Sequence, residues 1–223
     1  MRSPFRVGNP VAALLLCGTL VLVACGQGAP QARPAATATP TIVPPTPTAT
    51  PDPAALAAQW MPKQLSIPRL GVKSKVIGVG ADSNGNMLAP VDAPPGDPLW
   101  DEVYWWNGGA VPGRTGNAVI AGHVNRPTPG PAPFTALTDL RKGDTIQILA
   151  TNGQTLTFAV VDIQTPSAYE TGANNPVLVG IFGPSNTPNL NLITCYGTYD
   201  GHTFDHRLVV FTRLVGPSPF PHA

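Results

Sequence analysis

The chain has 223 residues with 28 prolines and 23 glycines, which is far too much Pro and Gly for a helical bundle and lacks the glycine period of collagen. Only 11% of residues are charged and the formal net charge is +1, which excludes the basic surface that a nucleic-acid partner requires. Because 43% of residues are hydrophobic, the composition indicates a loop-rich, mainly β folded part joined to a Pro-rich segment rather than a disordered chain.

The N-terminal segment is typical of an export signal. Arg2 and Arg6 precede an apolar run over residues 11–24, which is shorter than the about 20 residues of a membrane-spanning helix and fits a signal peptide. The run ends in Leu-Val-Ala-Cys-Gly at residues 22–26, which resembles a bacterial lipoprotein lipobox. That resemblance implies a signal peptide over residues 1–24 and a lipid anchor on Cys25, on the outer face of the cytoplasmic membrane. The alternatives are an uncleaved N-terminal anchor or secretion, and the domain is exported in each case.

A spacer follows the signal. Residues 25–63 are rich in Pro, Ala and Thr, and Arg33 and Asp52 carry charges within residues 26–62. Such a segment cannot bury enough apolar surface to offset its ordering entropy, so we expect an extended linker with a short helical turn near residues 54–60. The linker would hold a domain away from the membrane.

Residues 64–215 have the pattern of one β domain. Strands are expected at residues 65–67, 72–79, 117–121, 144–150, 155–163, 190–195 and 207–214. Residues 145–148 alternate with period two, and Asn152-Gly153 is a strong hairpin signal before the next strand. Helical periodicity is confined to brief stretches near residues 134–140 and 176–182. About eight short strands favour a closed barrel or a sandwich, followed by a flexible tail over residues 216–223.

Three residues at expected strand ends carry reactive groups. His123 follows one strand, Cys195 closes another and Arg207 opens a third. Cys195 is the only cysteine that would remain in the exported domain, as a buried apolar residue or as a reactive thiol. A thiolate can attack a carbonyl, an imidazole can move protons, and a guanidinium can stabilise an oxyanion. The combination therefore suits acyl transfer.

These segments resemble the sortases, the bacterial cysteine transpeptidases, whose signature is a Thr-Leu-x-Thr-Cys strand end with an upstream His and a downstream Arg. Residues 192–195 match the signature, while Asn191 stands in place of its leading Thr. The segments 66–71, 121–123, 130–134 and 137–144 look most like class F, with class E as neighbour. Tyr196-Gly197 departs from the Gly-Gly frequent in class F.

The resemblance implies an all-β fold, a closed eight-stranded sortase-type barrel with short helices and long loops. It implies that Cys195 is the nucleophile, His123 the general acid and base, and Arg207 the oxyanion and substrate clamp. The resemblance also implies that Leu192, Thr194 and Ala121 are substrate-binding residues. No cofactor or metal is expected.

The implied activity is cleavage of a Leu-Pro-x-Thr-Gly sorting signal between Thr and Gly, through a thioester that passes to an amine of the cell wall or a pilin. The partners would be the sorting signal, the amine and the membrane, and the protein would be a monomer. Alternatives are a hydrolytic cysteine peptidase and a weak or inactive sortase-fold peptide-binding domain. An L,D-transpeptidase fits less well, because its signature places His and Arg beside the Cys.

Some residues have competing interpretations. His202 and His206 lie near Arg207 in sequence, and His222 lies in the tail, so each competes with His123 for the role of base. Arg207 could instead form a surface ion pair with Asp205 or Asp200. At least one of Trp100, Trp105 and Trp106 is expected in the core. Asp97, Asp101, Glu102 and Glu170 are the only plausible calcium ligands, and scattered carboxylates are usually just solvated.

Overall fold

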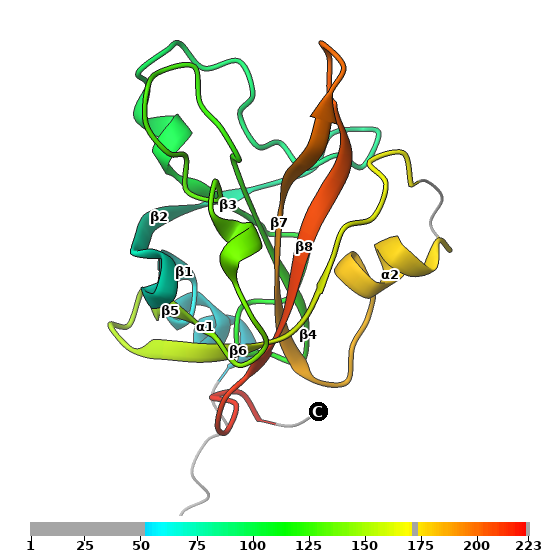
Figure 1. The fold of residues 1–223 in the computed structure, drawn as a ribbon. Coiled ribbons are helices and arrows are strands. Elements are labelled where there is room, and N and C mark those ends of the chain that lie inside the picture. Colours follow the sequence, from blue (N-terminus) through cyan, green and yellow to red (C-terminus); the bar gives the residue numbers. More distant parts are fainter. Residues whose placement is uncertain (1–51, 171–173, 222–223) are drawn as a thin grey trace, which may run out of the picture. The chain divides into compact units, whose positions relative to one another are not determined.

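Eight strands close into a barrel in the order β1-β2-β3-β4-β7-β8-β6-β5 (Figure 1). This computed structural model describes residues 52–170 and 174–221. The strands are β1 Pro62–Ile67, β2 Val72–Val79, β3 Val103–Trp106, β4 Gly116–Gly122, β5 Thr145–Ala150, β6 Thr155–Gln164, β7 Pro188–Tyr199 and β8 Phe204–Leu214. The helices are α1 Pro53–Gln59 and α2 Pro176–Phe182, with 3₁₀ turns η1 Pro68–Leu70, η2 Pro98–Asp101 and η3 Leu137–Asp139.

Two parallel pairings interrupt an otherwise antiparallel barrel. β2 pairs with β3 and β4 pairs with β7 in parallel, and each pairing requires a long connection between the two strands. The connection from β2 to β3 contains η2, and the one from β4 to β7 contains β5, β6 and α2. Because β4 and β7 run in the same direction, their carboxyl ends lie at the same end of the barrel.

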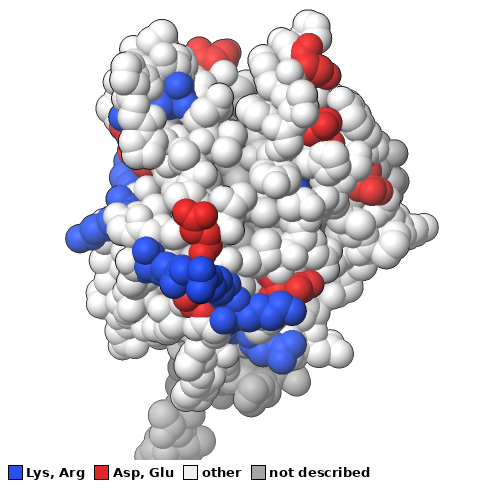
Figure 2. All heavy atoms as spheres, viewed as in Figure 1, with Lys and Arg blue, Asp and Glu red and all other residues white. Residues whose placement is uncertain are grey.

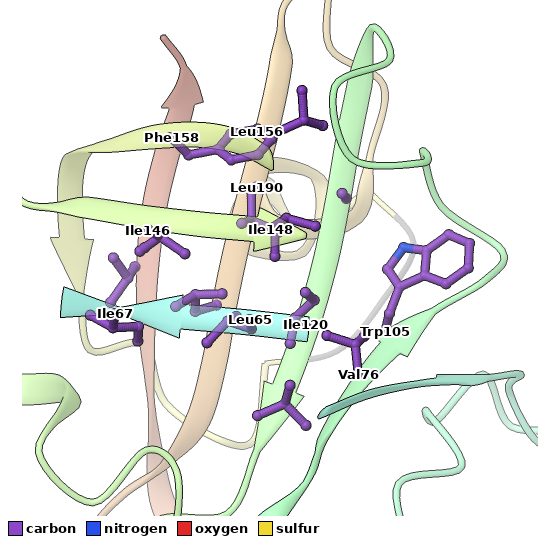
Figure 3. Close-up of a cluster of buried hydrophobic side chains, with 14 of the residues drawn as sticks. Leu65, Ile67, Val76, Trp105, Ile120, Ile146, Ile148, Leu156, Phe158 and Leu190 are labelled. Atoms are coloured by element: carbon purple, nitrogen blue, oxygen red, sulfur yellow. The ribbon is translucent and has the colours of Figure 1, made fainter. Parts of the chain in front are cut away.

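Alternating side chains fill the barrel. In β5 the burial of successive residues alternates, and Ile146 and Ile148 are fully buried. Leu65, Ile67 and Phe158 join them in one continuous apolar core (Figure 3). The two-residue period of the sequence therefore reflects one face turned to the core and one turned outward.

The prediction of a closed eight-stranded barrel is confirmed, and the sandwich alternative is wrong. The seven expected strands all occur, and α2 and η3 fall within the two expected helical stretches. β3 was not expected as a strand. Its residues Val103, Tyr104 and Trp105 are all buried, so the segment lacks the alternation that marks a half-exposed strand.

The predicted linker boundary at residue 63 needs correction. Asp52 caps α1, and its side chain accepts a hydrogen bond from the Ala54 N–H at 3.0 Å. Trp60 is only 7% exposed and belongs to the barrel core, and the Met61 carbonyl accepts a hydrogen bond from Thr151. The folded part therefore begins at α1, because one large aromatic side chain ties this Pro-rich segment to the core.

The prediction of a flexible tail over residues 216–223 also needs correction for residues 216–221, which the structure describes. Phe220 is only 8% exposed, and its ring lies 6.3 Å from that of Trp60. The Ser218 hydroxyl donates to the Gly113 carbonyl at 2.7 Å. The two ends of the described chain therefore pack together against the barrel.

The signal peptide, Cys25 and most of the predicted linker lie outside the described residues. Within residues 52–170 and 174–221, no helix is long and apolar enough to cross a membrane. On the face drawn in Figure 2, Lys and Arg gather in one band across the lower part of the barrel, and the rest of that face carries isolated charges.

Candidate active site

Strand pairing brings the three predicted catalytic residues together. Cys195 of β7 stands opposite Arg207 of β8 in the antiparallel register. On the other side of β7, Ala121 of β4 stands opposite Ile193. His123 lies two residues after Ala121, as Cys195 lies two residues after Ile193. His123 therefore follows the end of β4 at the level of Cys195. His123, Cys195 and Arg207 line one cavity of about 570 Å³. The half-buried thiol of Cys195 is free.

Thr194 links the cysteine strand to the histidine. Its side chain is only 4% exposed, and its hydroxyl donates to the Gly122 carbonyl at 2.8 Å. Gly122 directly precedes His123, and the His123 carbonyl accepts a hydrogen bond from the Phe134 N–H at 3.0 Å. Bonds to the residue before His123 and to His123 itself therefore fix the backbone from which the imidazole projects.

The imidazole of His123 lies among aromatic rings. The Trp100 ring centroid is 4.5 Å away and that of Tyr104 is 6.0 Å away. Burial lowers the pKa of His123 below its ordinary value, and a hydrogen bond with the Pro90 backbone partly opposes that effect. His123 is therefore mainly neutral near neutral pH, the form that accepts a proton from a thiol.

Arg207 is held by neutral acceptors. Its guanidinium donates to the Phe204 and His206 carbonyls, each at 3.0 Å, and to the Thr203 hydroxyl at 3.3 Å. Among the described residues no carboxylate lies within ion-pair distance of Arg207. The alternative that Arg207 forms a surface ion pair with Asp205 or Asp200 is therefore wrong. A fixed guanidinium that lines the cavity can donate hydrogen bonds to a substrate oxygen.

The competing histidines have other surroundings. His206 is a neighbour of Arg207, but its Nδ1 lies 2.9 Å from a carboxylate oxygen of Asp205. His202 is exposed in a turn whose backbone N–H groups donate to Asp200. His222 lies outside the described residues. Of the histidines that the structure describes, only His123 lines the cavity with Cys195.

The predicted substrate contacts divide into two groups. Ala121 and Thr194 line the cavity, although Thr194 is nearly buried and bonded to the backbone. The prediction for Leu192 is wrong, because this side chain is 0% exposed within the barrel core. Alternation along β7 explains the difference, since Ile193 and Cys195 share the outer face while Leu192 points inward.

Sequence reasoning missed most of the cavity wall. The loop between β2 and β3, the segment before α2 and α2 itself contribute Met87, Val91, Ala168, Val177 and Phe182, among others. The apolar composition of α2 is the one signal that could have indicated a helix covering the barrel. Loop residues acquire their place only from the fold.

Asn191, the departure from the sortase signature, has a structural role. It is 1% exposed, and its side-chain amide donates to the Ile181 carbonyl at 2.8 Å. The Asn117 amide donates to the Gly183 carbonyl at 2.9 Å. The two amides tie the C-terminal end of α2 to β7 and β4, and so position one wall of the cavity.

The carboxylates weighed as calcium ligands serve other partners. Asp97 caps η2, and Glu102 lies 3.4 Å from the ammonium group of Lys75. Asp101 pairs with Arg126 and Glu170 accepts a hydrogen bond from Asn175. In the described part of the chain, no group of three or more His, Cys, Asp or Glu side chains could hold a metal ion.

Comparisons with known proteins agree with this geometry. Residues 65–215 match the family profile described as Sortase domain. Sortase C1 from Streptococcus agalactiae is 21% identical with a TM-score of 0.50, over 69% of this chain and 67% of that one. Sortase C-1 from Actinomyces oris is 22% identical with a TM-score of 0.50, over 69% of this chain and 73% of that one.

At these identities the structural likeness concerns the fold. No curated protein matches the chain. The family profile spans well over half of the chain and includes the residues that line the cavity. The chain therefore belongs to the sortase family, the bacterial cysteine transpeptidases.

Proposed function

We propose that this chain is an active transpeptidase that cleaves a sorting signal of the Leu-Pro-x-Thr-Gly type between Thr and Gly and transfers the acyl group to an amine. The observation that carries the proposal is the convergence of His123, Cys195 and Arg207 from three separate segments on one cavity. A thiol, a half-buried imidazole and a guanidinium without a carboxylate partner among the described residues form a complete set for acyl transfer.

The first half-reaction forms a thioester. The sulfur of Cys195, deprotonated to the thiolate with His123 as proton acceptor, attacks the carbonyl carbon of the signal's Thr. Arg207 donates hydrogen bonds to the resulting oxyanion. When the intermediate collapses, the C–N bond to Gly breaks, and His123 gives its proton to the departing amine.

The second half-reaction transfers the acyl group. An incoming amine attacks the thioester carbon, and neutral His123 accepts the proton that the amine loses. The C–S bond then breaks and releases Cys195. The amine would come from a cell-wall precursor or a pilin, and water in its place would give hydrolysis.

The cavity supports a peptide substrate with apolar residues before the cleaved bond. Met87, Val91, Val177 and Phe182 contribute apolar side chains to its wall. Such a lining suits the Leu and Pro of the signal, because burial of their side chains would contribute binding free energy of about 25 cal/mol per Å².

The class and the cellular setting are parts of the same proposal. The motifs at residues 121–123 and 130–134 support class F. The lipobox-like sequence at residues 22–26 supports a lipid anchor on Cys25 and a place on the outer face of the membrane. Loss of lipid-precursor labelling in the Cys25→Ala variant would support the anchor, and undiminished labelling would contradict it.

The test of activity uses the full chain, a set of Leu-Pro-x-Thr-Gly-like peptides and an amine acceptor. Mass spectrometry should detect the thioester on Cys195 and the transpeptidation product in the wild type, and neither in Cys195→Ala. His123→Ala should lose activity, whereas the matched control His206→Ala should keep it. Hydrolysis without transfer would favour a peptidase, and peptide binding without turnover would favour a binding domain.

A further inference from the structure

We propose that η2 (Pro98–Asp101) is a positioning element for the proposed general acid and base His123, with Trp100 as its positioning residue. The inference rests on the proposed function for its catalytic meaning. Two contacts join η2 directly to the segment that carries His123, although the two are more than twenty residues apart in sequence. A further contact joins Trp100 to the rest of the loop between β2 and β3.

The first contact is between rings. The centroids of the Trp100 indole and the His123 imidazole are 4.5 Å apart with an interplanar angle of 46°. Trp100 is not among the residues that line the cavity, so its ring contacts the imidazole without forming part of the substrate-facing wall. A ring in that place restricts rotation of the imidazole and keeps water from it.

The second contact runs through the loop between β2 and β3. The Trp100 indole N–H lies 3.2 Å from the Ala93 carbonyl and 3.1 Å from that of Pro94. The Pro90 backbone, in the same loop, is the polar group that partly opposes the effect of burial on the pKa of His123. Trp100 therefore ties η2 to the loop whose Pro90 backbone acts on the pKa of His123.

The third contact is an ion pair between Asp101 of η2 and Arg126, three residues after His123. The Arg126 guanidinium also donates to the Pro129 carbonyl at 3.1 Å. Arg126 is thereby a brace across the loop that begins at His123. A brace at that point limits movement of the backbone that carries the imidazole.

η2 is itself fixed through the backbone of Leu99. The Asp97 side chain accepts a hydrogen bond from the Leu99 N–H at 2.9 Å, and the Tyr104 hydroxyl donates to the Leu99 carbonyl at 2.5 Å. Tyr104 is a β3 residue that is 1% exposed. The positioning element is thus anchored to the barrel through β3 as well as to the loop that follows His123.

The protonation of His123 can be measured as a test, because few other titratable groups lie on the cavity with it. Burial and the carboxylates of Glu102 and Asp97 raise the pKa of Tyr104 to about 12, so this phenol stays neutral across the working range. Cys195, Arg207 and Glu170 are the other titratable groups on the cavity. Removal of the Trp100 ring admits water, which favours the charged imidazole and raises the pKa of His123 toward its ordinary value of about 6.5.

The experiment compares Trp100→Ala, Trp100→Phe and the matched control Trp60→Phe, whose site lies in the core against Phe220. Titration of the imidazole protons by NMR, assigned with His123→Gln, needs no substrate. Trp100→Ala should raise the His123 midpoint, and Trp100→Phe and Trp60→Phe should leave it near the wild-type value. Carboxamidomethylation of Cys195 by iodoacetamide against pH gives a second readout without substrate.

In the transpeptidation assay Trp100→Ala should lower kcat by about tenfold or more, because misplaced catalytic groups cost about that much. Trp100→Phe should lower kcat by about fivefold, the worth of one lost hydrogen bond. KM should change little in both, and Trp60→Phe should keep the wild-type kcat. An unchanged His123 midpoint in Trp100→Ala, or an equal loss of kcat in Trp60→Phe, would overturn the proposal.

If Trp100→Ala does not fold, Trp100→Phe and Asp101→Asn decide the matter. Both should lower kcat at unchanged KM, and wild-type kcat in both would overturn the proposal. A wild-type chain without transpeptidase activity would refute the proposed function but not this inference, because the NMR and alkylation readouts would still show whether Trp100 governs His123.

Discussion

The hydrogen bond from Thr194 to Gly122 offers the sharpest test of how the strands position the histidine. Thr194→Val replaces the hydroxyl by a methyl group of similar size, and so removes the bond of 2.8 Å without opening a cavity. Thr194 is 4% exposed, so water cannot readily replace the lost donor. The substitution therefore isolates one polar contact.

The expected cost follows from that burial. A net hydrogen bond contributes about 1 kcal/mol, and an unsatisfied carbonyl adds to the penalty, so the free energy of unfolding should fall by about 1–2 kcal/mol. For a unit of this size the Tm should fall by about 3–6 °C. Because Gly122 directly precedes His123, we also expect kcat to fall by about tenfold.

The barrel provides a matched control. The Thr212 hydroxyl on β8 donates to the Leu190 carbonyl at 2.6 Å, and Thr212 is 1% exposed. Thr212→Val should lose similar stability in thermal and urea unfolding but keep the wild-type kcat, and Thr194→Ser should keep both. If Thr194→Val loses stability yet retains full kcat at unchanged KM, the bond supports the barrel without positioning His123.

Three further predictions concern the core, the tail and pH. Leu192→Ala should lower the free energy of unfolding by about 2–5 kcal/mol, because Leu192 lies in the core and not in the pocket. The KM should be unchanged at a temperature where the variant is folded, and a raised KM would contradict the placement of Leu192 in the core. Phe220→Ala should lower the Tm, because the packing of Phe220 on Trp60 is lost. An unchanged Tm would support the prediction of a flexible tail. Burial lowers the pKa of His123, so the unfolded chain takes up a proton at a higher pH than the folded chain does. The free energy of unfolding of the wild type should therefore fall as the pH drops below about 6.5. His123→Gln should gain relative to wild type in urea unfolding below that pH, and an equal pH dependence of both proteins would refute the stated cause.

The barrel was largely predictable because most strands have one face in the core. Residues 145–150 alternate in burial as the sequence alternates in polarity. β3 was not predictable by that signal, because Tyr104 is covered on one face of the strand and Trp105 on the other. The ends of the domain escaped notice because single aromatic residues, Trp60 and Phe220, join Pro-rich segments to the core.

The meeting of His123, Cys195 and Arg207 at one cavity could be predicted from a motif, but their surroundings could not. Residues at a strand end can be recognised by type and position, as His123 and Cys195 were. The motif itself does not distinguish a residue that contacts substrate from one that fills the core, and Leu192 shows this. Trp100 reaches His123 from a different connection of the barrel, so no local pattern in the sequence relates the two.

The proposed catalytic residues differ in how the fold fixes them. Cys195 and Arg207 lie within paired strands, directly opposite each other, so the backbone ladder sets their relation. His123 lies beyond the end of β4 and has no ladder partner. Its place depends on one backbone hydrogen bond from Phe134 and on two side chains, the Thr194 hydroxyl bonded to Gly122 and the Trp100 ring beside the imidazole. Substitutions away from the cavity should therefore disturb the proposed proton transfers of His123 before they disturb the proposed roles of Cys195 as nucleophile and Arg207 as oxyanion donor.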